Sequence, residues 1–239
     1  MIIDQRRYTT ESGKTAEFFD LQKARGFDLL TAFLERLVGY FYTIDDGPEQ
    51  IVHLWRYKDV AEWETLQPRL YAIAELKPYF ATARRILVRQ ENSFLTPFSE
   101  PALSPLWSLR DWLPAAGPVF RHHPELTVRE TTLAFAPSAL PQYLEVLAAR
   151  APHAAGFGSG LIGAFKTLVG RQHVVTFYRC TGGQFGDSDF SPSSACEHWT
   201  AIDAATRDLA PERTDRLLKP APLPILSPMF DMSRAAIST

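Results

Sequence analysis

The sequence of 239 residues predicts an α+β protein made of two halves that pack sheet to sheet. Residues 1–98 show strand and helix patterns in the order β-α-β-β-α-β, and a similar order returns in residues 125–230. The stretch 99–124 between them holds five prolines among apolar residues, which indicates a packed connector. A sheet with helices on one face leaves its other face bare, and a second sheet can bury it. Residues 231–239 are expected to form a flexible tail.

The clearest strand of the first half is the stretch QIVHLWRY. Its β-branched and aromatic residues favour a strand. His53, Trp55 and Tyr57 are two residues apart, so they share one face of it. Asp59 and Glu62 follow as a capping box, which predicts that a helix begins there. The face that carries His53 is therefore either core with polar tips or the wall of a pocket.

A second strand with polar residues is predicted at the start of the chain, over residues 2–10. Asp4, Arg6 and Tyr8 lie on one face of it by their two-residue spacing. Buried charges need partners, so these side chains either line a cavity or form a salt bridge with partners such as Glu91 or Arg89 on an adjacent strand. Ser12 is a residue type that caps helices, and we expect it to cap the one that follows.

The remaining elements of the first half follow from periodicity and turn signals. An amphipathic helix is predicted from apolar residues at helical spacing, and Gly26 is expected to divide the helical region into two parts. Gly39 then opens a strand over 40–44. A helix over 59–71, a helical turn from Pro78 and a strand over 86–95 complete a ferredoxin-like order. The apolar helical stripe consists of Leu30, Phe33, Leu34 and Leu37.

The second half repeats the pattern at similar spacing. A strand is predicted over 127–135 and a helix over 137–150, and Gly163 opens a hairpin 124 residues after Gly39. Two short matches support a tandem duplication. The segment Gln172–Phe177 matches Gln50–Trp55, and Leu226–Pro228 matches Leu95–Pro97.

In this alignment the polar face that carries Asp4, Arg6, Tyr8 and His53 belongs to the first half. The second half adds a Gly- and Ser-rich stretch over 180–193, which we expect to be a flexible loop. A capping box at Ser194 and Glu197 follows it. The matched pairs are Asp4 with Arg129, Arg6 with Thr131, Tyr8 with Leu133, His53 with Val175, and Trp55 with Phe177.

Composition excludes several classes of function. The net charge is −2 and no basic run occurs, so neither nucleic acid nor a membrane surface is an expected partner. Two cysteines in a long chain do not indicate a disulfide framework, and no apolar window is long enough to span a membrane. The histidines lack metal-ligand spacing, so no metal and no cofactor are expected. We expect a cytoplasmic protein.

The candidate site lies on the polar face of the first half. His53 is a candidate general base or ligand anchor, since its ordinary pKa is close to neutral. Aromatic strand residues can stack on a ligand, although they are more often core. The candidate catalytic residues are His53, Tyr8 and Arg6, and the candidate substrate-binding residues are Asp4, Trp55, Tyr57 and Tyr40.

These residues carry a family resemblance. The run from Val52 to Tyr57 resembles the V-H-L-W-x-Y signature of the NIPSNAP family, whose members adopt the dimeric α+β barrel fold. Asp4, Arg6 and Tyr8 resemble the family's E-x-R-x-Y strand, with Asp in place of Glu. The resemblance implies a small-molecule pocket in the first half and an oxidoreductase or monooxygenase that needs no cofactor. A non-catalytic binding or scaffold protein is the alternative, and a homodimer is compatible with either.

Overall fold

A computed structural model describes most of the chain, and it divides the chain into two compact units. The first unit is Met1–Phe94, Gly117–His122 and Leu218–Thr239, and the second is Leu95–Ala116 and His123–Leu217. The described residues are 1–99, 103, 120–121, 126–136, 138–154, 161–181, 202, 204–210 and 212–231.

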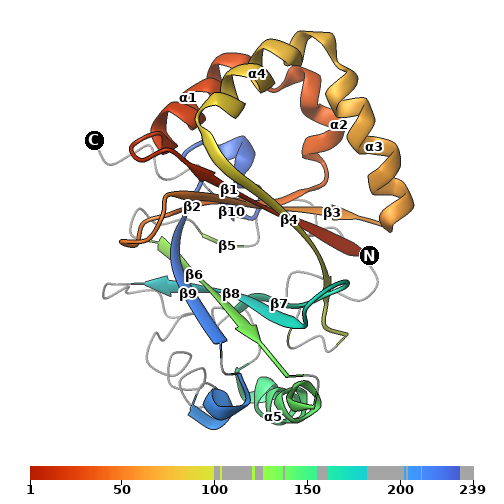
Figure 1. The fold of residues 1–239 in the computed structure, drawn as a ribbon, viewed down its shortest axis with the longest axis vertical. Coiled ribbons are helices and arrows are strands. Elements are labelled where there is room, and N and C mark those ends of the chain that lie inside the picture. The colour runs from red at the N-terminus through yellow and green to blue at the C-terminus, as the bar shows by residue number, and fades with distance from the viewer. Residues whose placement is uncertain are drawn as a thin grey trace. The chain divides into compact units, whose positions relative to one another are not determined.

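Strands and short helices alternate along the first hundred residues (Figure 1). In the first unit, the helices lie on one face of the sheet formed by β1, β2 and β3 (Figure 1). The elements are β1 (Ile2–Thr10), α1 (Thr15–Arg25), η1 (Asp28–Leu30), α2 (Thr31–Leu34), β2 (Leu37–Thr43), β3 (Gln50–Tyr57), α3 (Val60–Ala72), η2 (Ala74–Leu76), α4 (Lys77–Arg85) and β4 (Leu87–Pro97).

The rest of the chain adds six strands and one long helix among the described residues. Helix α5 lies on one face of the strands β6, β7 and β8 in the second unit (Figure 1). The elements are β5 (Phe120–Arg121), β6 (Leu126–Ala134), α5 (Ala139–Ala154), β7 (Leu161–Thr167), β8 (His173–Thr181), η5 (Arg207–Leu209), β9 (Glu212–Pro220), η6 (Pro224–Leu226) and β10 (Phe230–Asp231).

Eight strands follow the closed hydrogen-bonded order β1-β3-β2-β9-β6-β8-β7-β4, which is the topology of a β-barrel. The predicted α+β class is therefore confirmed. The last residues of β4, Leu95–Pro97, pair with β7 and belong to the second unit. The last residues of β9, Leu218–Pro220, pair with β2 and belong to the first unit. Each compact unit thus includes the end of a strand that begins in the other.

Strand register places the candidate residues of the first unit side by side. In the antiparallel pair β1–β3, Arg6 lies opposite His53 and Asp4 lies opposite Trp55. In the pair β2–β3, Tyr40 lies opposite His53. His53 is therefore flanked on both neighbouring strands by polar residues, because β3 lies between β1 and β2.

The hairpins β2–β3 and β7–β8 have a register shift at the same place, which allows their residues to be matched. The register of β2 on β3 shifts between Leu37 and Gly39, and that of β7 on β8 shifts between Leu161 and Gly163. Leu37 lies opposite Trp55, whereas Leu161 lies opposite Tyr178. Trp55 therefore corresponds to Tyr178.

This register corrects the alignment made from sequence. The counterpart of His53 is Thr176 instead of Val175, and the counterpart of Trp55 is Tyr178 instead of Phe177. The match of Gln172–Phe177 with Gln50–Trp55 was misleading because the second hairpin loop differs in length from the first. Likewise, Leu95–Pro97 corresponds to Leu218–Pro220 and not to Leu226–Pro228, because these ends occupy equivalent places on β7 and β2.

Helix ends in the first unit differ from expectation at two places. The predicted helical stripe from Leu30 to Leu37 is wrong, since a one-turn helix ends at Leu34 and Leu37 begins β2. Ser12 does not cap α1. Instead, the Glu49 carboxylate accepts hydrogen bonds from the amide of Gly13 at 2.6 Å and from the hydroxyl of Thr15 at 2.7 Å. A carboxylate near a helix N-terminus is favoured by the helix dipole, and sequence spacing does not reveal this distant partner.

Other predicted boundaries are confirmed. Asp59 caps α3, because its Oδ1 accepts a hydrogen bond from the amide of Glu62 at 2.9 Å. Gly26, with a φ of 76°, ends α1. Its left-handed backbone is a conformation that glycine adopts readily. The chain after it can therefore turn away from the helix axis.

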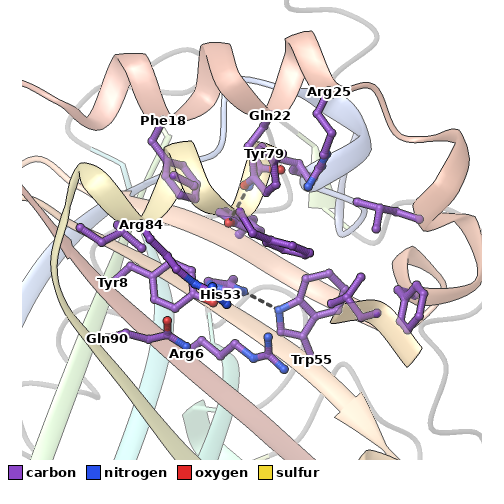
Figure 2. A pocket seen from close by; sticks show the side chains of 18 of the residues that line it. Arg6, Tyr8, Phe18, Gln22, Arg25, His53, Trp55, Tyr79, Arg84 and Gln90 are labelled. Carbon is purple, nitrogen blue, oxygen red and sulfur yellow. Dashed lines mark hydrogen bonds between the residues drawn. The ribbon is translucent and has the colours of Figure 1, made fainter. Parts of the chain in front are cut away.

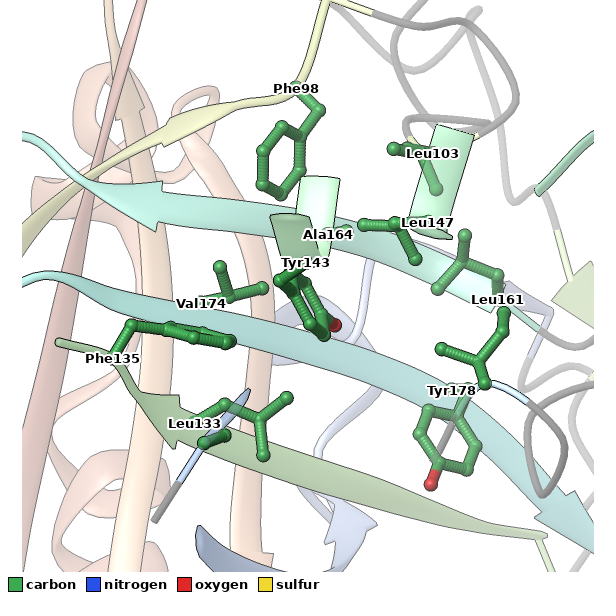
Figure 3. Packing of buried hydrophobic residues seen from close by; sticks show 12 residues of the cluster. Phe98, Leu103, Leu133, Phe135, Tyr143, Leu147, Leu161, Ala164, Val174 and Tyr178 are labelled. Carbon is green, nitrogen blue, oxygen red and sulfur yellow. The ribbon is translucent and has the colours of Figure 1, made fainter. Parts of the chain in front are cut away.

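Each unit has its own hydrophobic cluster. The cluster of the second unit packs one face of β6, β7 and β8 against α5 (Figure 3). Leu103, from the Pro-rich stretch, is buried in this cluster, and the other residues over 104–119 lie outside the described part. The cluster of the first unit includes Phe18, Phe19, Leu37, Tyr40, Ile51, Ala83 and Ile86.

Several expectations fall on residues that are not described. The predicted loop over 180–193 lies outside the described residues except for Cys180 and Thr181, which end β8. The capping box at Ser194 and Glu197 lies outside them too, as do residues 232–239. None of the helices in the described ranges is both long and apolar enough to cross a membrane.

Candidate functional site

A cavity lies between the sheet and the helices of the first unit (Figure 2). Its accessible volume is about 100 Å³, which is room for several waters. Five of the seven candidate residues line it. They are Arg6, Tyr8, Tyr40, His53 and Trp55.

His53 is held in the sheet wall of this cavity by three aromatic neighbours. The ring of Tyr40 stacks on it with centroids 4.4 Å apart, and Tyr8 meets it edge-on at 4.7 Å. The indole Nε1–H of Trp55 donates a hydrogen bond to Nδ1 of His53 (Figure 2). The other ring nitrogen, Nε2, is buried and has no hydrogen-bond partner among the described residues.

This bonding fixes the protonation state of His53. An indole N–H can only donate, so Nδ1 must be the acceptor and Nε2 carries the proton of the neutral ring. Burial, together with the nearby positive charge of Arg6, holds the pKa of His53 well below its ordinary value. His53 is therefore a neutral N–H donor at physiological pH. The bonding does not favour the general-base role, because the one free lone pair is already engaged by Trp55.

Asp4 and Arg6 form a buried ion pair at the edge of the cavity. Nε and Nη2 of Arg6 each lie 2.8 Å from Oδ2 of Asp4. Trp63 and Asn92 also donate hydrogen bonds to Asp4, at 2.9 and 3.1 Å. Burial disfavours the charge on Arg6, but the Asp4 carboxylate outweighs it and the pKa of Arg6 is raised. Asp4 itself is fully buried and does not line the cavity, so it positions Arg6.

The partners suggested for this pair from the sequence were wrong. Arg89 and Glu91 form an ion pair with each other at 2.7 Å on the surface. On β1, the ion pair joins Asp4 to Arg6. Both outcomes follow from strand geometry, because residues two apart on one face are near neighbours.

The phenols in the cavity are neutral donors. Burial raises the pKa of Tyr8, although Arg6 opposes this shift. Burial raises the pKa of Tyr40 well above its ordinary value, and Gln22 donates a hydrogen bond to its oxygen at 3.0 Å. Tyr57 lies outside the cavity lining, and burial raises its pKa to about 12. Gln67 donates to the Tyr57 oxygen at 2.8 Å, so this phenol already has a partner in the core.

Sequence reasoning missed the helical side of the cavity. Phe18, Gln22 and Arg25 project into it from α1, and Tyr79 and Arg84 come from α4 (Figure 2). A signal was present in α1, because residues 18, 22 and 25 have the i, i+4, i+7 spacing of one helix face. A polar residue in such a stripe indicates a lined cavity or a buried hydrogen bond.

No group of three or more metal-ligating side chains occurs among the described residues. The polar groups that line the cavity include N–H and O–H donors and guanidinium groups. These groups bind and stabilise negative charge.

Solved structures define the class of fold. A Lactobacillus acidophilus protein, provisionally named a monooxygenase, aligns over 92% of this chain and 93% of its own, with a TM-score of 0.54 and 10% identity. A Fusobacterium nucleatum protein with the same provisional name aligns over 92% and 91%, with a TM-score of 0.59 and 9% identity. At these identities the likeness concerns the fold, an α+β barrel.

The family follows from the first hundred residues. Residues 3–101 match the family model NIPSNAP. A NIPSNAP-like domain protein from Burkholderia xenovorans is 35% identical over 46% of this chain and 97% of its own, with a TM-score of 0.39. The chain belongs to the NIPSNAP family, as its strand motifs predicted. No match was found among curated proteins.

Proposed function

We propose that the first unit binds a small organic molecule and oxidises it with molecular oxygen, without a bound cofactor. The observation that carries this proposal is the unpartnered Nε2–H of His53 in the wall of a cavity. A buried donor without a partner is unfavourable, so a ligand that supplies an acceptor atom would be stabilised there. Tyr8 and Arg6 add two more donors beside it.

This set of groups suits a substrate that reacts as an oxyanion. An enolisable or phenolic compound loses a proton more readily where its anion is stabilised by fixed donors. Such an electron-rich anion can react with oxygen directly. In the overall reaction a CH₂ group and O₂ give a carbonyl group and water. His53 would donate to the oxyanion, and Arg6 would add positive charge close to it.

A non-catalytic binding protein is the second candidate. It is favoured by two observations: no carboxylate lines the described part of the cavity, and the lone pair of His53 is engaged by Trp55. A site without a free base can hold an anion without turning it over. The two candidates share the cavity and differ in whether oxygen is consumed.

We also infer that the chain is a tandem duplication of two ferredoxin-like halves. Equivalent hydrogen bonds recur at regular spacing in the two units, which supports this inference. Thr43 Oγ1 accepts from the amide of Gln50 at 2.8 Å, and Thr167 Oγ1 accepts from the amide of His173 at 3.0 Å. The amide of Ala221 donates to Tyr40 at 2.8 Å, as that of Phe98 does to Ala164 at 3.3 Å. In this view the site was retained in one copy.

Oxygen uptake with planar enolisable or phenolic compounds tests the enzymatic proposal. Anthrone and 2-naphthol are suitable first probes, followed with an oxygen electrode and by product mass. We expect His53→Thr to lower the rate by about 10²–10³-fold, the usual effect of removing one oxyanion donor. Tyr8→Phe should lower the rate in the same assay because it removes a hydroxyl group. Tyr42→Phe is the matched control, since Tyr42 does not line the cavity.

Three results would change the conclusion. Binding of the probes without oxygen uptake would favour the non-catalytic candidate. Uptake that is equal in wild type and His53→Thr would reject His53 as the donor. Absence of both binding and uptake would count against a small-molecule site in the first unit.

A further inference from the structure

We propose that the cavity of the first unit takes a planar organic anion whose charged group pairs with Arg25. The proposal rests on the proposed function in one respect, namely that the cavity holds a small molecule. It adds the charge of that molecule and the residue that recognises it. Arg25 comes from α1, on the helical side of the cavity (Figure 2).

The charges around the cavity are unbalanced. Three arginines line it, which are Arg6, Arg25 and Arg84. Among the described lining residues none is aspartate or glutamate, and the raised pKa values of Tyr8 and Tyr40 keep both phenols neutral. Asp4 balances Arg6 from outside the lining. A positive charge therefore remains, and it favours an anion over a neutral or cationic ligand.

The guanidinium group of Arg25 is only partly hydrogen-bonded. Its Nε donates to the carbonyl oxygen of Gly26 at 3.0 Å, whereas Nη2 is buried and has no partner among the described residues. A buried guanidinium N–H without an acceptor is unfavourable. No carboxylate of the described residues pairs with this side chain, so the acceptor that fits is one that a ligand brings.

Two aromatic rings hold the Arg25 guanidinium group in place. Its central carbon lies 4.4 Å from the centroid of the Tyr79 ring and 5.2 Å from that of Phe27. Cation–π contacts of this kind restrict the movement of the group. A guanidinium group is a planar fork of N–H donors, which matches a carboxylate in a bidentate pair.

The rest of the cavity indicates a flat apolar body for the ligand. Phe18 and Trp55 line it together with Phe33 and Phe80. Aromatic walls favour stacking on planar rings. A naphthalene or larger ring system with a carboxylate or phenolate group combines both properties.

Calorimetric titration with a matched pair of probes tests the charge requirement. The probes are 2-naphthoate and 2-naphthamide, which share ring and size and differ in charge. We expect wild type to prefer the naphthoate by about 10- to 100-fold, the effect of a hydrogen bond to a charged group. Arg25→Gln should remove this preference, because it weakens the binding of the naphthoate far more than that of the naphthamide. Arg25→Lys should keep part of the preference, because the charge stays and the planar fork is lost.

Lys23→Gln is the matched control, because Lys23 is exposed on the same helix, does not line the cavity and carries the same charge. It should keep the full preference, and circular dichroism should show that all variants are folded. Equal affinity of wild type for both probes would overturn the anion proposal while leaving the small-molecule site intact. Failure of wild type to bind either probe at millimolar concentration would contradict both.

Discussion

The two units share one pattern of strand hydrogen bonds. In the first unit the sheet carries a polar cavity, whereas in the second the equivalent face carries a hydrophobic core. At equivalent positions Tyr8 is replaced by Leu133, Tyr40 by Ala164 and His53 by Thr176. Leu133 and Ala164 belong to the hydrophobic cluster of the second unit (Figure 3). The scaffold therefore does not require a polar site. The polar residues of the first unit are explained better by binding than by folding.

The helices show the same contrast. Phe18 and Gln22 are buried on α1, and Tyr143 and Leu147 are buried on α5. Each pair is separated by four residues and faces the sheet of its own unit. Where the first unit buries an amide that bonds to Tyr40, the second buries a leucine. A buried leucine generally contributes more to stability than a buried amide does, which favours the proposal that the first unit binds a ligand.

The buried acid Asp4 of the first unit has a partly exposed counterpart in the second. Asp4 on β1 bonds to Asn92 on β4, whereas in the second unit Arg129 on β6 bonds to Asp215 on β9. The positions are equivalent, but the acid has moved to the other strand. Asp4 is fully buried, and the Asp215 side chain is about a third exposed at 34%.

We expect Asp4→Asn to lower the free energy of unfolding by about 3–5 kcal/mol, because it leaves the buried Arg6 charge without its counter-ion. Asp215→Asn should cost about 1 kcal/mol or less, since its ion pairs are screened by solvent. Urea unfolding followed by tryptophan fluorescence measures both. Equal losses in the two variants would show that burial does not distinguish the pairs.

The titration of His53 is expected to have a smaller effect on the free energy of unfolding. Its pKa in the folded protein lies well below the ordinary value, mainly because of burial. Between that low pKa and about 6.5 the unfolded chain binds a proton that the folded protein excludes, so stability falls as the pH falls. The slope is about 1.4 kcal/mol per pH unit. Thr176, the counterpart in the second unit, cannot titrate.

His53→Thr should therefore flatten the dependence of stability on pH between 7.5 and 5.5. Urea unfolding of wild type and variant at both values gives the comparison. His173, whose pKa is lowered more modestly by partial burial, provides the control in His173→Gln. If His53→Thr leaves the slope unchanged, His53 is not held neutral in the folded protein.

Sequence patterns predicted the strands β1 to β4, the strand β6, the hairpin that follows Gly163 and most of the helices, but they missed β9. They did so because alternation, capping residues and turn residues act locally, as Asp59 and Gly26 illustrate. They failed where a partner is distant in the chain. Glu49, which caps α1, lies 34 residues after Thr15, and no local rule connects the two.

The site was predicted on its sheet side and missed on its helical side. His53, Tyr8 and Arg6 share faces of neighbouring strands, and the two-residue period was enough to bring them together. Arg25 and Tyr79 enter the cavity because two helices pack over the sheet, and that packing depends on tertiary contacts. The role of His53 also needed geometry, because the hydrogen bond from Trp55 decides which nitrogen carries the proton.

The smallest expected effect on stability concerns a hairpin threonine that both units have. Thr43 Oγ1 donates to the carbonyl oxygen of Pro48 at 3.2 Å, and Thr167 Oγ1 donates to that of Arg171 at 2.8 Å. Each hydroxyl also accepts an amide hydrogen bond from the first residue of the next strand. The side chains therefore close equivalent hairpin loops, and the same substitution should have the same effect in each.

Thr43→Val and Thr167→Val keep the side-chain shape and remove the hydroxyl. We expect each to lower the free energy of unfolding by about 1 kcal/mol, the usual net value of a hydrogen bond. The double variant should lose the sum, because distant sites without shared partners are additive. Urea unfolding of the three variants tests this, with Thr65→Val as a control for an exposed helical hydroxyl that bonds to Ala61. A loss in one hairpin without a similar loss in the other would mean that the two loops, despite equal bonding, are no longer equivalent in energy.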